Sequence, residues 1–396
     1  MTSPDLPPHA HGRAEVVVDL AAVRRNVATL KAAVGDARMM TVVKADGYGH
    51  GMVEVARAAR EGGADWLGVA VMEEALALRA AGDTGPILTW LAVPGESYAG
   101  CVEAGVDVTA YTVAELDEIA TTAREIGVPA RVQLKIDTGL SRGGSTEQLW
   151  PGLVQAAAAA EESGAVRVTG VWSHFACSDE PDHPANKEQE DAFREACFVL
   201  ESTGIEPEVR HLANSAAALL RPSSRFDLVR CGIASYGVSP APDVVTSAEL
   251  GLVPAMTVRG RLALVKRVPA GAGVSYGHTY RTPVETTVGV VPMGYGDGVP
   301  RHASSRAEVL VAGRRRRVLG RVCMDQLVVD LGDDDVATGD EVVLFGTGVH
   351  GEPTAQDWAE ACDTIGYEIV TRMGAKFLGR MARVHVDTDA TEGEDR

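Results

Sequence analysis

The sequence has few positive charges for its length, and it lacks several familiar functional patterns. Its 396 residues carry 37 Lys and Arg against 55 Asp and Glu, which gives a formal net charge of −18. This excess of acid disfavours nucleic acid and anionic membrane surfaces as main partners. No apolar run reaches the length of a transmembrane helix. Residues 1–12 lack the basic, apolar and small-residue order of a signal peptide, so we expect a flexible tail there.

Cysteine and histidine show no metal-binding pattern. The six cysteines are scattered without a CxxC pair, and the ten histidines contain no HExxH sequence. In a chain of this length, such cysteines indicate reduced thiols in a cytoplasmic protein rather than a disulfide framework. The sequence therefore gives no support for a metal centre.

Strand-like and helix-like segments alternate from about residue 39 to about residue 237. Short apolar runs rich in β-branched residues are followed by segments of helical character. The expected strands are 39–44, 66–70, 86–91, 106–111, 131–137, 166–174, 209–213 and 228–231. Eight such repeats in roughly 200 residues favour a closed (β/α)8 barrel over an open doubly wound sheet.

After about residue 248 the pattern becomes β-rich, with alternating side chains and glycine-marked turns. We expect β segments at 255–268, 286–291, 308–311, 317–319, 326–330 and 341–345, with helices only near 355–362 and 368–373. The fold class is therefore α/β: a (β/α)8 TIM-type barrel over 13–247, then a mostly β domain over 248–386. The acidic end, 387–396, is expected to be disordered. The basic run 314–317 indicates a solvated hairpin.

Lys44 is the most informative residue, because it directly follows a buried apolar strand and precedes Ala-Asp-Gly-Tyr-Gly-His-Gly. An amine in an apolar pocket loses its proton readily and attacks carbonyl carbons, including the aldehyde of pyridoxal 5'-phosphate (PLP). A solvated surface lysine is the competing interpretation. Active sites of such barrels lie where strands end, and Asp137, His174 and Asn214 also occupy strand ends. The glycines do not have the GxGxxG spacing of a dinucleotide loop.

Eight segments, taken in order, resemble the alanine racemase family. They are 44–51, 135–142, 173–175, 211–217, 230–233, 273–278, 323–325 and 366–368. Each segment is weak evidence alone, whereas the ordered set spans both expected domains. The resemblance implies a PLP-dependent isomerase that interconverts L-alanine and D-alanine for peptidoglycan. It also implies a homodimer in which each active site borrows residues from the partner's β domain. The strand-like piece 14–19 precedes the barrel, and the family uses a similar opening segment beside its β domain, so the resemblance leaves the domain boundary without a clean cut.

The resemblance also implies roles for individual residues. Lys44 would bind PLP covalently and transfer a proton on one face of the substrate Cα, and Tyr276 would serve the opposite face in the partner's site. Arg230, supported by His211, would face the PLP ring nitrogen, where it cannot accept a proton. Further cofactor contacts are implied for Tyr48, His174, Asn214, Ser215, Gly232, Ile233 and Tyr367.

The substrate carboxylate is assigned by the same resemblance to Arg142 and Met324, with Asp325 at the entrance. Lys135 is implied to carry a carbamate that orients Arg142, and an unmodified Lys135 paired with Asp137 is the alternative. For His174, a packed core histidine is nearly as well supported as a cofactor contact.

Other activities remain open at this stage. A broader racemase that accepts serine is one, since rejecting a substrate by a single hydroxyl is intrinsically weak. A PLP decarboxylase is disfavoured because such enzymes usually place an acid at the ring nitrogen. A non-catalytic PLP carrier is disfavoured because those proteins are usually single barrels without a β domain.

Overall fold

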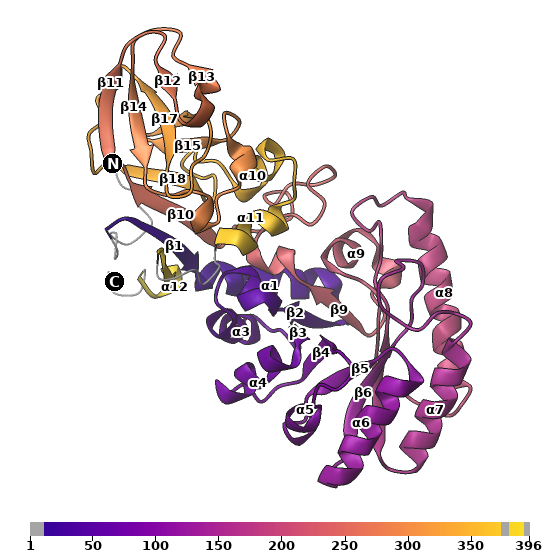
Figure 1. Cartoon of the computed structure of the whole chain (residues 1–396). Helices are drawn as coiled ribbons and strands as arrows, with labels where there is room; N and C mark the ends of the chain where they lie inside the picture. Colours follow the sequence, from indigo (N-terminus) through magenta and orange to yellow (C-terminus); the bar gives the residue numbers. More distant parts are fainter. Residues whose placement is uncertain (1–11, 374–379, 392–396) are drawn as a thin grey trace.

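The computed structural model describes residues 12–373 and 380–391, which form two parts (Figure 1). A parallel barrel surrounded by helices lies at the lower right of the view, and a mostly β part lies at the upper left. The expected architecture, a (β/α)8 barrel followed by a mostly β part, is confirmed.

The barrel is an eight-stranded parallel sheet with the order β8-β7-β6-β5-β4-β3-β2-β9. Its edges meet where the Arg230 amide donates to the Ala213 carbonyl at 2.9 Å. Because all strands run the same way, their carboxyl ends gather at one mouth. The strands are β2 (Arg38–Val42), β3 (Trp66–Val71), β4 (Ile87–Leu91), β5 (Asp107–Ala110), β6 (Ala130–Lys135), β7 (Val166–Trp172), β8 (Val209–His211) and β9 (Leu228–Cys231).

Helices between the strands cover the barrel, and α6 (Val113–Ile126) shows how the sequence sets them. Thr112 accepts a hydrogen bond from the Glu115 amide at its start, and Gly127, with a φ of 76°, ends it. Its buried residues are spaced three or four apart, so one face packs on the sheet. The others are α1 (Leu20–Val34), α2 (Lys44–Tyr48), α3 (Met52–Glu61), α4 (Met72–Ala80), α5 (Ala99–Glu103), α7 (Trp150–Glu162), α8 (Pro184–Glu201) and α9 (Ser215–Leu220), with the 3₁₀ turns η1 (Pro222–Ser224) and η2 (Ile233–Tyr236).

The β part contains a nine-stranded sheet with the order β11-β14-β17-β16-β15-β18-β10-β1-β19 and the small pair β12-β13. Its strands are β1 (Ala14–Asp19), β10 (Met256–Arg261), β11 (Leu264–Val268), β12 (Gly273–Val274), β13 (Tyr280–Arg281), β14 (Thr286–Val291), β15 (Glu308–Val311), β16 (Arg314–Leu319), β17 (Leu327–Gly332), β18 (Glu341–Phe345) and β19 (Ala382–Val386). Its helical segments are η3 (Tyr276–His278), η4 (Tyr295–Asp297), η5 (Arg301–Ala303), α10 (Ala355–Ala361), α11 (Gly366–Met373) and α12 (Thr388–Thr391).

Strand β1 precedes the barrel in sequence but belongs to the other sheet, between β10 and β19. The buried guanidinium of Arg259 fixes this pairing, with Nη2 2.6 Å from Glu15 Oε1 and Nη1 3.4 Å from Glu341 Oε2. Residues 14–19 of the segment assigned to the barrel thus form a strand of the other sheet, and the first barrel strand begins at Arg38. Glu15 and Arg259 are 244 residues apart, so no local pattern reveals their contact.

Three smaller expectations also change. The expected β segment 255–268 is two strands, because Leu262 and Ala263 interrupt it. The basic run 314–317 belongs to an antiparallel hairpin, but it lies within the second strand of that hairpin. The expectation of a disordered acidic end is wrong for 387–391, because Asp387 lies 2.5 Å from Arg24 and α12 follows it. Residues 392–396, and residues 1–11 of the expected tail 1–12, lie outside the described residues.

The described part of the chain contains no membrane-spanning helix, no metal-ligand cluster and no disulfide. None of its helices is both long and apolar enough to cross a bilayer. Within the same residues, no group of three or more His, Cys, Asp or Glu side chains gathers as a metal site would require. The six cysteines are all free thiols.

Candidate active site

Lys44 begins a left-handed turn at the mouth of the barrel. Ala45, Asp46, Gly47 and Tyr48 have φ values of 53°, 54°, 63° and 52°. Three of these residues carry a Cβ, and each such residue costs roughly 1–2 kcal/mol in this conformation. The surroundings hold the turn, because Glu74 accepts from the Ala45 amide at 2.7 Å and Asp46 accepts from a backbone amide at the start of α3. A backbone kept in this shape by its neighbours is typical of a functional site.

The Lys44 amine lies in an environment that disfavours its charge. Burial lowers the pKa of Lys44, and the positive charge of Arg142 lowers it further. The Nζ atom also lies 5.7 Å from the centre of the Trp90 ring. A neutral amine is the nucleophilic form, so the site prepares Lys44 to attack a carbonyl carbon.

Lys135 lies in the same mouth and carries a second unusual amine. Burial, then Arg230 and Arg142, lowers the pKa of Lys135 to about 7. Its Nζ lies 4.3 Å from the centre of the Trp172 ring. The charge of Asp137 raises the pKa of Lys135 but does not outweigh burial, and Asp137 Oδ1 accepts from two backbone amides of the following loop. Lys44, Lys135, Arg142 and Arg230 thus concentrate positive charge, which suits an anionic ligand.

Arg230 is buried and held by five acceptors. Its Nη1 donates to His211 Nδ1 at 2.9 Å and to the His211 carbonyl at 3.1 Å. Its Nη2 donates to the Ser173 and Leu212 carbonyls and to His174 Nδ1 at 3.0 Å. Burial lowers the pKa of Arg230 to about 9, and burial together with Arg230 lowers the pKa of both histidines. The histidines therefore remain neutral acceptors, and the guanidinium is fixed in one orientation.

A group of hydrogen-bond donors lies beside these cations, where β9 ends. The Gly232 amide donates to Ser215 Oγ at 2.8 Å, so the hydroxyl keeps its own proton for another acceptor. A Cβ at Gly232 would lie 2.5 Å from the Tyr48 hydroxyl oxygen, which shows how closely Tyr48 approaches this backbone. Ile233 follows directly, and the Tyr367 ring lies 6.2 Å from the Tyr48 ring. Serine and tyrosine hydroxyls gathered in one place can donate hydrogen bonds to an anionic group such as a phosphate.

Asn214, for which a cofactor contact was predicted, caps a helix at the barrel mouth. Its Oδ1 accepts from the Ala217 amide at 3.1 Å and from the Ser178 hydroxyl at 2.9 Å. Asn214 is therefore the N-cap of α9, and Ser215, for which a cap was also considered, is its first helical residue. This capping leaves the Ser215 side chain to face Gly232 rather than the helix backbone.

Tyr276, Met324 and Asp325 are not brought to this mouth. All three lie in the β part, where Tyr276 is 69% exposed and Met324 is 52% exposed. Strands β12 and β13, which flank Tyr276, lie at the end of the β part farthest from the barrel (Figure 1). Asp325 pairs with Arg380 at 2.5 Å. The predicted site residues therefore form two separate groups within one chain.

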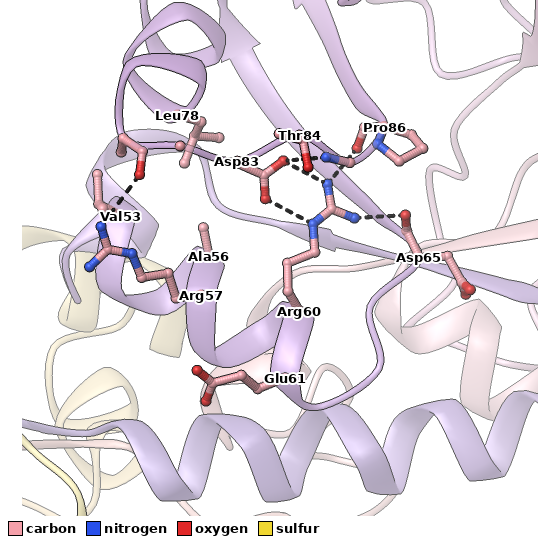
Figure 2. Close-up of a pocket in the computed structure, with 13 residues that line it drawn as sticks. Val53, Ala56, Arg57, Arg60, Glu61, Asp65, Leu78, Asp83, Thr84 and Pro86 are labelled. Carbon is pink, nitrogen blue, oxygen red and sulfur yellow. Dashed lines mark hydrogen bonds and ion pairs between the residues drawn. The ribbon is translucent and has the colours of Figure 1, made fainter.

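A cavity between α3 and α4 does not belong to the barrel mouth (Figure 2). It is lined by residues that precede β3 and β4, so it lies at the opposite end of the barrel. Arg60 lines this cavity. Its guanidinium donates to both side-chain oxygens of Asp83, at 2.9 and 3.0 Å, and to the backbone carbonyls of Asp65 and Pro86. These bonds fix the loops that enter the strands, which is a structural role.

Comparisons with known proteins identify the family. The family model "Alanine racemase, N-terminal domain" matches residues 18–240, and "Alanine racemase, C-terminal domain" matches residues 255–381. The chain belongs to the alanine racemase family. The predicted class, an isomerase that interconverts L-alanine and D-alanine, is confirmed, and the general role of the family is to supply D-alanine for peptidoglycan.

Several alanine racemases from other organisms align with this chain over nearly their whole length. An alanine racemase from Frankia casuarinae is 58% identical over 93% of this chain and 96% of its own. One from Streptomyces coelicolor is 55% identical over 95% of this chain and 96% of its own. The crystal structure of alanine racemase from a D-cycloserine-producing Streptomyces lavendulae has a TM-score of 0.93 and 54% identity, and the match covers 96% and 98% of the two chains.

Some residues of the racemase mouth were not predicted from the sequence. Trp90 lies beside Lys44. Trp172 lies beside Lys135 and stacks on His211, with ring centres 5.7 Å apart. Gln133 Oε1 forms a hydrogen bond with His211 Nε2. The sequence signal that could have found Gln133 is the two-residue period of a strand. Gln133 and Lys135 are two residues apart on β6, so their side chains lie on the same face. Aromatic and amide residues inside a strand otherwise indicate ordinary packing.

Proposed function

We propose that this chain binds PLP covalently at Lys44 and racemises alanine as a homodimer with shared active sites. The observation that best supports this proposal is the environment of Lys44. Burial lowers the pKa of its amine, and the residue begins a left-handed turn beside a cluster of cationic side chains at the barrel mouth. The residues fit the cofactor, because the aldehyde needs a neutral amine and the phosphate needs donors. Ser215, Gly232, Ile233, Tyr48 and Tyr367 would bind the phosphate. The free cysteines fit a cytoplasmic location, which is part of the proposal.

Arg230 would bind the pyridine nitrogen of the cofactor. An arginine can only donate there, so it leaves the ring nitrogen without a proton of its own. This weakens the ring as an electron sink and favours return of the proton to the substrate Cα over side reactions. A PLP decarboxylase is disfavoured for the same reason. The neutral His211 and His174 would keep Arg230 in place.

Two proton-transfer groups would serve the two faces of the substrate. When bound, PLP draws electron density away from the Cα–H bond and so makes that proton removable. Lys44 would take or give the proton on one face. Tyr276 of the partner subunit would act on the other face, since β12 and β13, which flank Tyr276, lie far from β2, which precedes Lys44 (Figure 1). The exposure of Tyr276 supports this arrangement, because its side chain is available to a second copy.

The substrate carboxylate would be bound by Arg142 and by the backbone amide of Met324 of the partner subunit, with Asp325 of the partner subunit at the entrance. A small pocket then suits the methyl side chain of alanine. Acceptance of serine as a minor substrate follows from the weak discrimination that one hydroxyl allows.

Lys135 would carry a carbamate. With a pKa of about 7, a large share of its amine is neutral at neutral pH, which is the form that adds carbon dioxide. The ammonium form first loses one proton, the neutral Nζ then bonds the carbon of carbon dioxide, and a second proton leaves the nitrogen, so a cation becomes an anion beside Arg142 and Arg230. This change removes a repulsion among buried cations and provides acceptors for Arg142.

Mixed dimers test the shared site. Lys44→Ala and Tyr276→Phe subunits are each expected to be inactive alone, by a factor of about 10² or more. A heterodimer of the two has one site with both lesions and one intact site, so mixing after gentle dissociation should restore activity. If both residues acted within one chain, every site would keep a lesion and no activity would return.

Two chemical measurements test the cofactor and the reaction. Borohydride treatment of the protein with excess PLP should fix a label on the peptide that contains Lys44, and Lys44→Arg should abolish it. Incubation of the holoenzyme with L-alanine should end in a racemic mixture by chiral chromatography. Release of carbon dioxide would indicate a decarboxylase instead, and an unchanged isomer would indicate a carrier.

A further inference from the structure

A row of buried polar side chains crosses the interior of the barrel from Arg230 to the opposite wall. His211 Nε2 lies 2.7 Å from Gln133 Oε1, and Gln133 Nε2 donates to Asp107 Oδ2 at 2.9 Å. Gln133 and His211 are fully buried, Asp107 is 1% exposed and Arg230 is 4% exposed. The row extends from β9 through β8 and β6 to β5 and links the mouth to a carboxylate at the start of a strand.

The donors and acceptors of this row can be assigned from its two ends. Arg230 can only donate, so His211 Nδ1 must accept and His211 Nε2 must carry the proton. That proton requires an acceptor, so Gln133 presents its oxygen to His211 and its amide nitrogen to Asp107. A carboxylate can only accept, so Asp107 matches that nitrogen. Each bond is therefore consistent only with this orientation of the Gln133 amide.

Asp107 has no place for a proton of its own. Burial raises the pKa of Asp107, and the charge of Arg131 opposes this. Arg131 Nε donates to Asp107 Oδ1 at 2.6 Å, while Gln133 and Thr169 both donate to Oδ2. Both oxygens thus face donors, which favours the anion despite its burial. Arg131 Nη2 also lies 3.1 Å from Glu208 Oε2.

The strand next to β6 makes room for this arrangement. Gly170 of β7 pairs with Gln133, and a Cβ at position 170 would lie 2.8 Å from the Gln133 side-chain carbonyl carbon. Beside it, the Trp172 ring is nearly parallel to the His211 ring, with an angle of 4°. Gln133 and His211 are therefore packed closely enough to have one orientation each.

We propose that Gln133 and Asp107 are positioning residues that keep His211 in its Nε2–H form, so that Nδ1 always faces Arg230 as an acceptor. The proposal deepens the proposed function, because it rests on the role of Arg230 at the cofactor ring. Asp107 lies at the far end of the row, and it fixes the orientation of Gln133. Gln133 then fixes the tautomer of His211, and His211 orients Arg230.

The test is the tautomer of His211, observed by NMR of the full-length holoenzyme labelled with ¹⁵N-histidine and assigned with His211→Gln. The wild type should show a proton on Nε2 and none on Nδ1. In Asp107→Asn the new amide can donate to the Gln133 oxygen and turn the Gln133 amide around. His211 then loses its acceptor, and the Nε2–H form should no longer dominate. We expect kcat to fall by about tenfold, which is the size of effect seen when the hydrogen-bond partner of a metal-bound histidine is mutated. The KM for alanine should change less than kcat.

Two further variants separate positioning from a general loss of structure. In the double variant D107N/Q133E, the introduced glutamate accepts from His211 Nε2 and the introduced asparagine donates to that glutamate. This variant should therefore recover the Nε2–H form and much of kcat. Glu208→Gln touches Arg131 but not the row, and should leave the tautomer unchanged. If Asp107→Asn does not fold, Gln133→Met removes the acceptor with little change in volume and is expected to give the same mixed tautomer.

The outcomes are distinct. An unchanged Nε2–H signal in Asp107→Asn or Gln133→Met overturns the proposal, and so does a changed tautomer with unchanged kcat. A wild type that neither binds PLP nor racemises alanine overturns the proposed function instead, and the NMR result on the unloaded protein then still decides whether the row sets the tautomer.

Discussion

Arg383 Nη1 lies 2.6 Å from Asp46 Oδ2, and it also donates to the Gly49 carbonyl at 3.2 Å. Arg383 belongs to β19, near the end of the chain, whereas Asp46 is in the left-handed turn that begins at Lys44. His385 of the same strand lies 2.7 Å from the His50 carbonyl. The last strand of the β part thus holds the strained turn of the barrel from outside.

Removing this contact should loosen the Lys44 turn. In Arg383→Met, loss of a partly buried, charge-assisted hydrogen bond should lower the free energy of unfolding by about 1–2 kcal/mol. The turn should then retain PLP less well, measured as coenzyme lost on dialysis. The exposed Arg267, which pairs with Glu285 and Asp333, provides the control, since Arg267→Met should change stability by no more than about 0.5 kcal/mol. Equal coenzyme loss in both variants would argue against the contact.

Gly232→Ala should damage the proposed phosphate site. The added Cβ would lie 2.5 Å from the Tyr48 hydroxyl, so Tyr48 or the backbone must move at a cost of about 1–3 kcal/mol. We expect the apparent Kd for PLP to rise, by fluorescence titration. Gly152 is a matched control, because it lies in α7 and a Cβ added there would meet nothing within 4 Å. Gly152→Ala should add about 0.5–1 kcal/mol of stability and leave PLP binding unchanged.

The barrel could be predicted from the sequence because its strands and helices are local and regular. The strands are apolar runs of about five residues, helices such as α6 have a cap and a regular spacing of buried residues, and most strands that are neighbours in sequence pair in space. The strand ends then placed Lys44, Asp137 and His174 near one mouth. The family motifs supplied the cofactor, which spacing alone does not reveal.

The remainder depends on contacts that sequence patterns do not contain. The left-handed φ values of Ala45 and Asp46 oppose their own preferences and depend on Glu74 and Arg383. The place of β1 depends on Arg259, 244 residues from Glu15. These are non-local interactions, and single-sequence reasoning has access only to local ones.

Lys135 should make stability depend on pH in a defined window. Its pKa is about 7 when folded and 10.5 by its ordinary value, so between these values the unfolded chain binds the extra proton. Stability should therefore rise with pH across this window, by no more than about 1.4 kcal/mol per pH unit from this group. Below about 7 both states carry the proton and the burial penalty is complete; above 10.5 the dependence ends.

Urea unfolding of the wild type and Lys135→Met at pH 6, 8 and 10, in buffer free of carbon dioxide, measures this effect. The difference between the two proteins isolates Lys135 from the buried histidines, whose pKa values are also lowered. The wild type should gain on the variant as pH rises. A difference that stays constant with pH would show that Lys135 has an ordinary pKa.

Glu15 should be essential for joining the start of the chain to the β part. Its side chain is fully buried and lies 2.6 Å from Arg259, whose side chain is 1% exposed. In Glu15→Gln the shape is kept but the nearer of two negative charges beside the buried guanidinium is lost. Because Glu341 remains 3.4 Å away, the cost should not exceed the roughly 3–5 kcal/mol of an unpaired buried charge. Urea unfolding at neutral pH measures the loss, with Glu61→Gln as control, because the Arg24–Glu61 pair is 59% exposed on the glutamate side and should contribute at most about 1 kcal/mol. Since β1 pairs directly with β19, the strand that holds the Lys44 turn, Glu15→Gln should also weaken PLP retention; equal retention in the two variants would show that the turn does not depend on this strand pair.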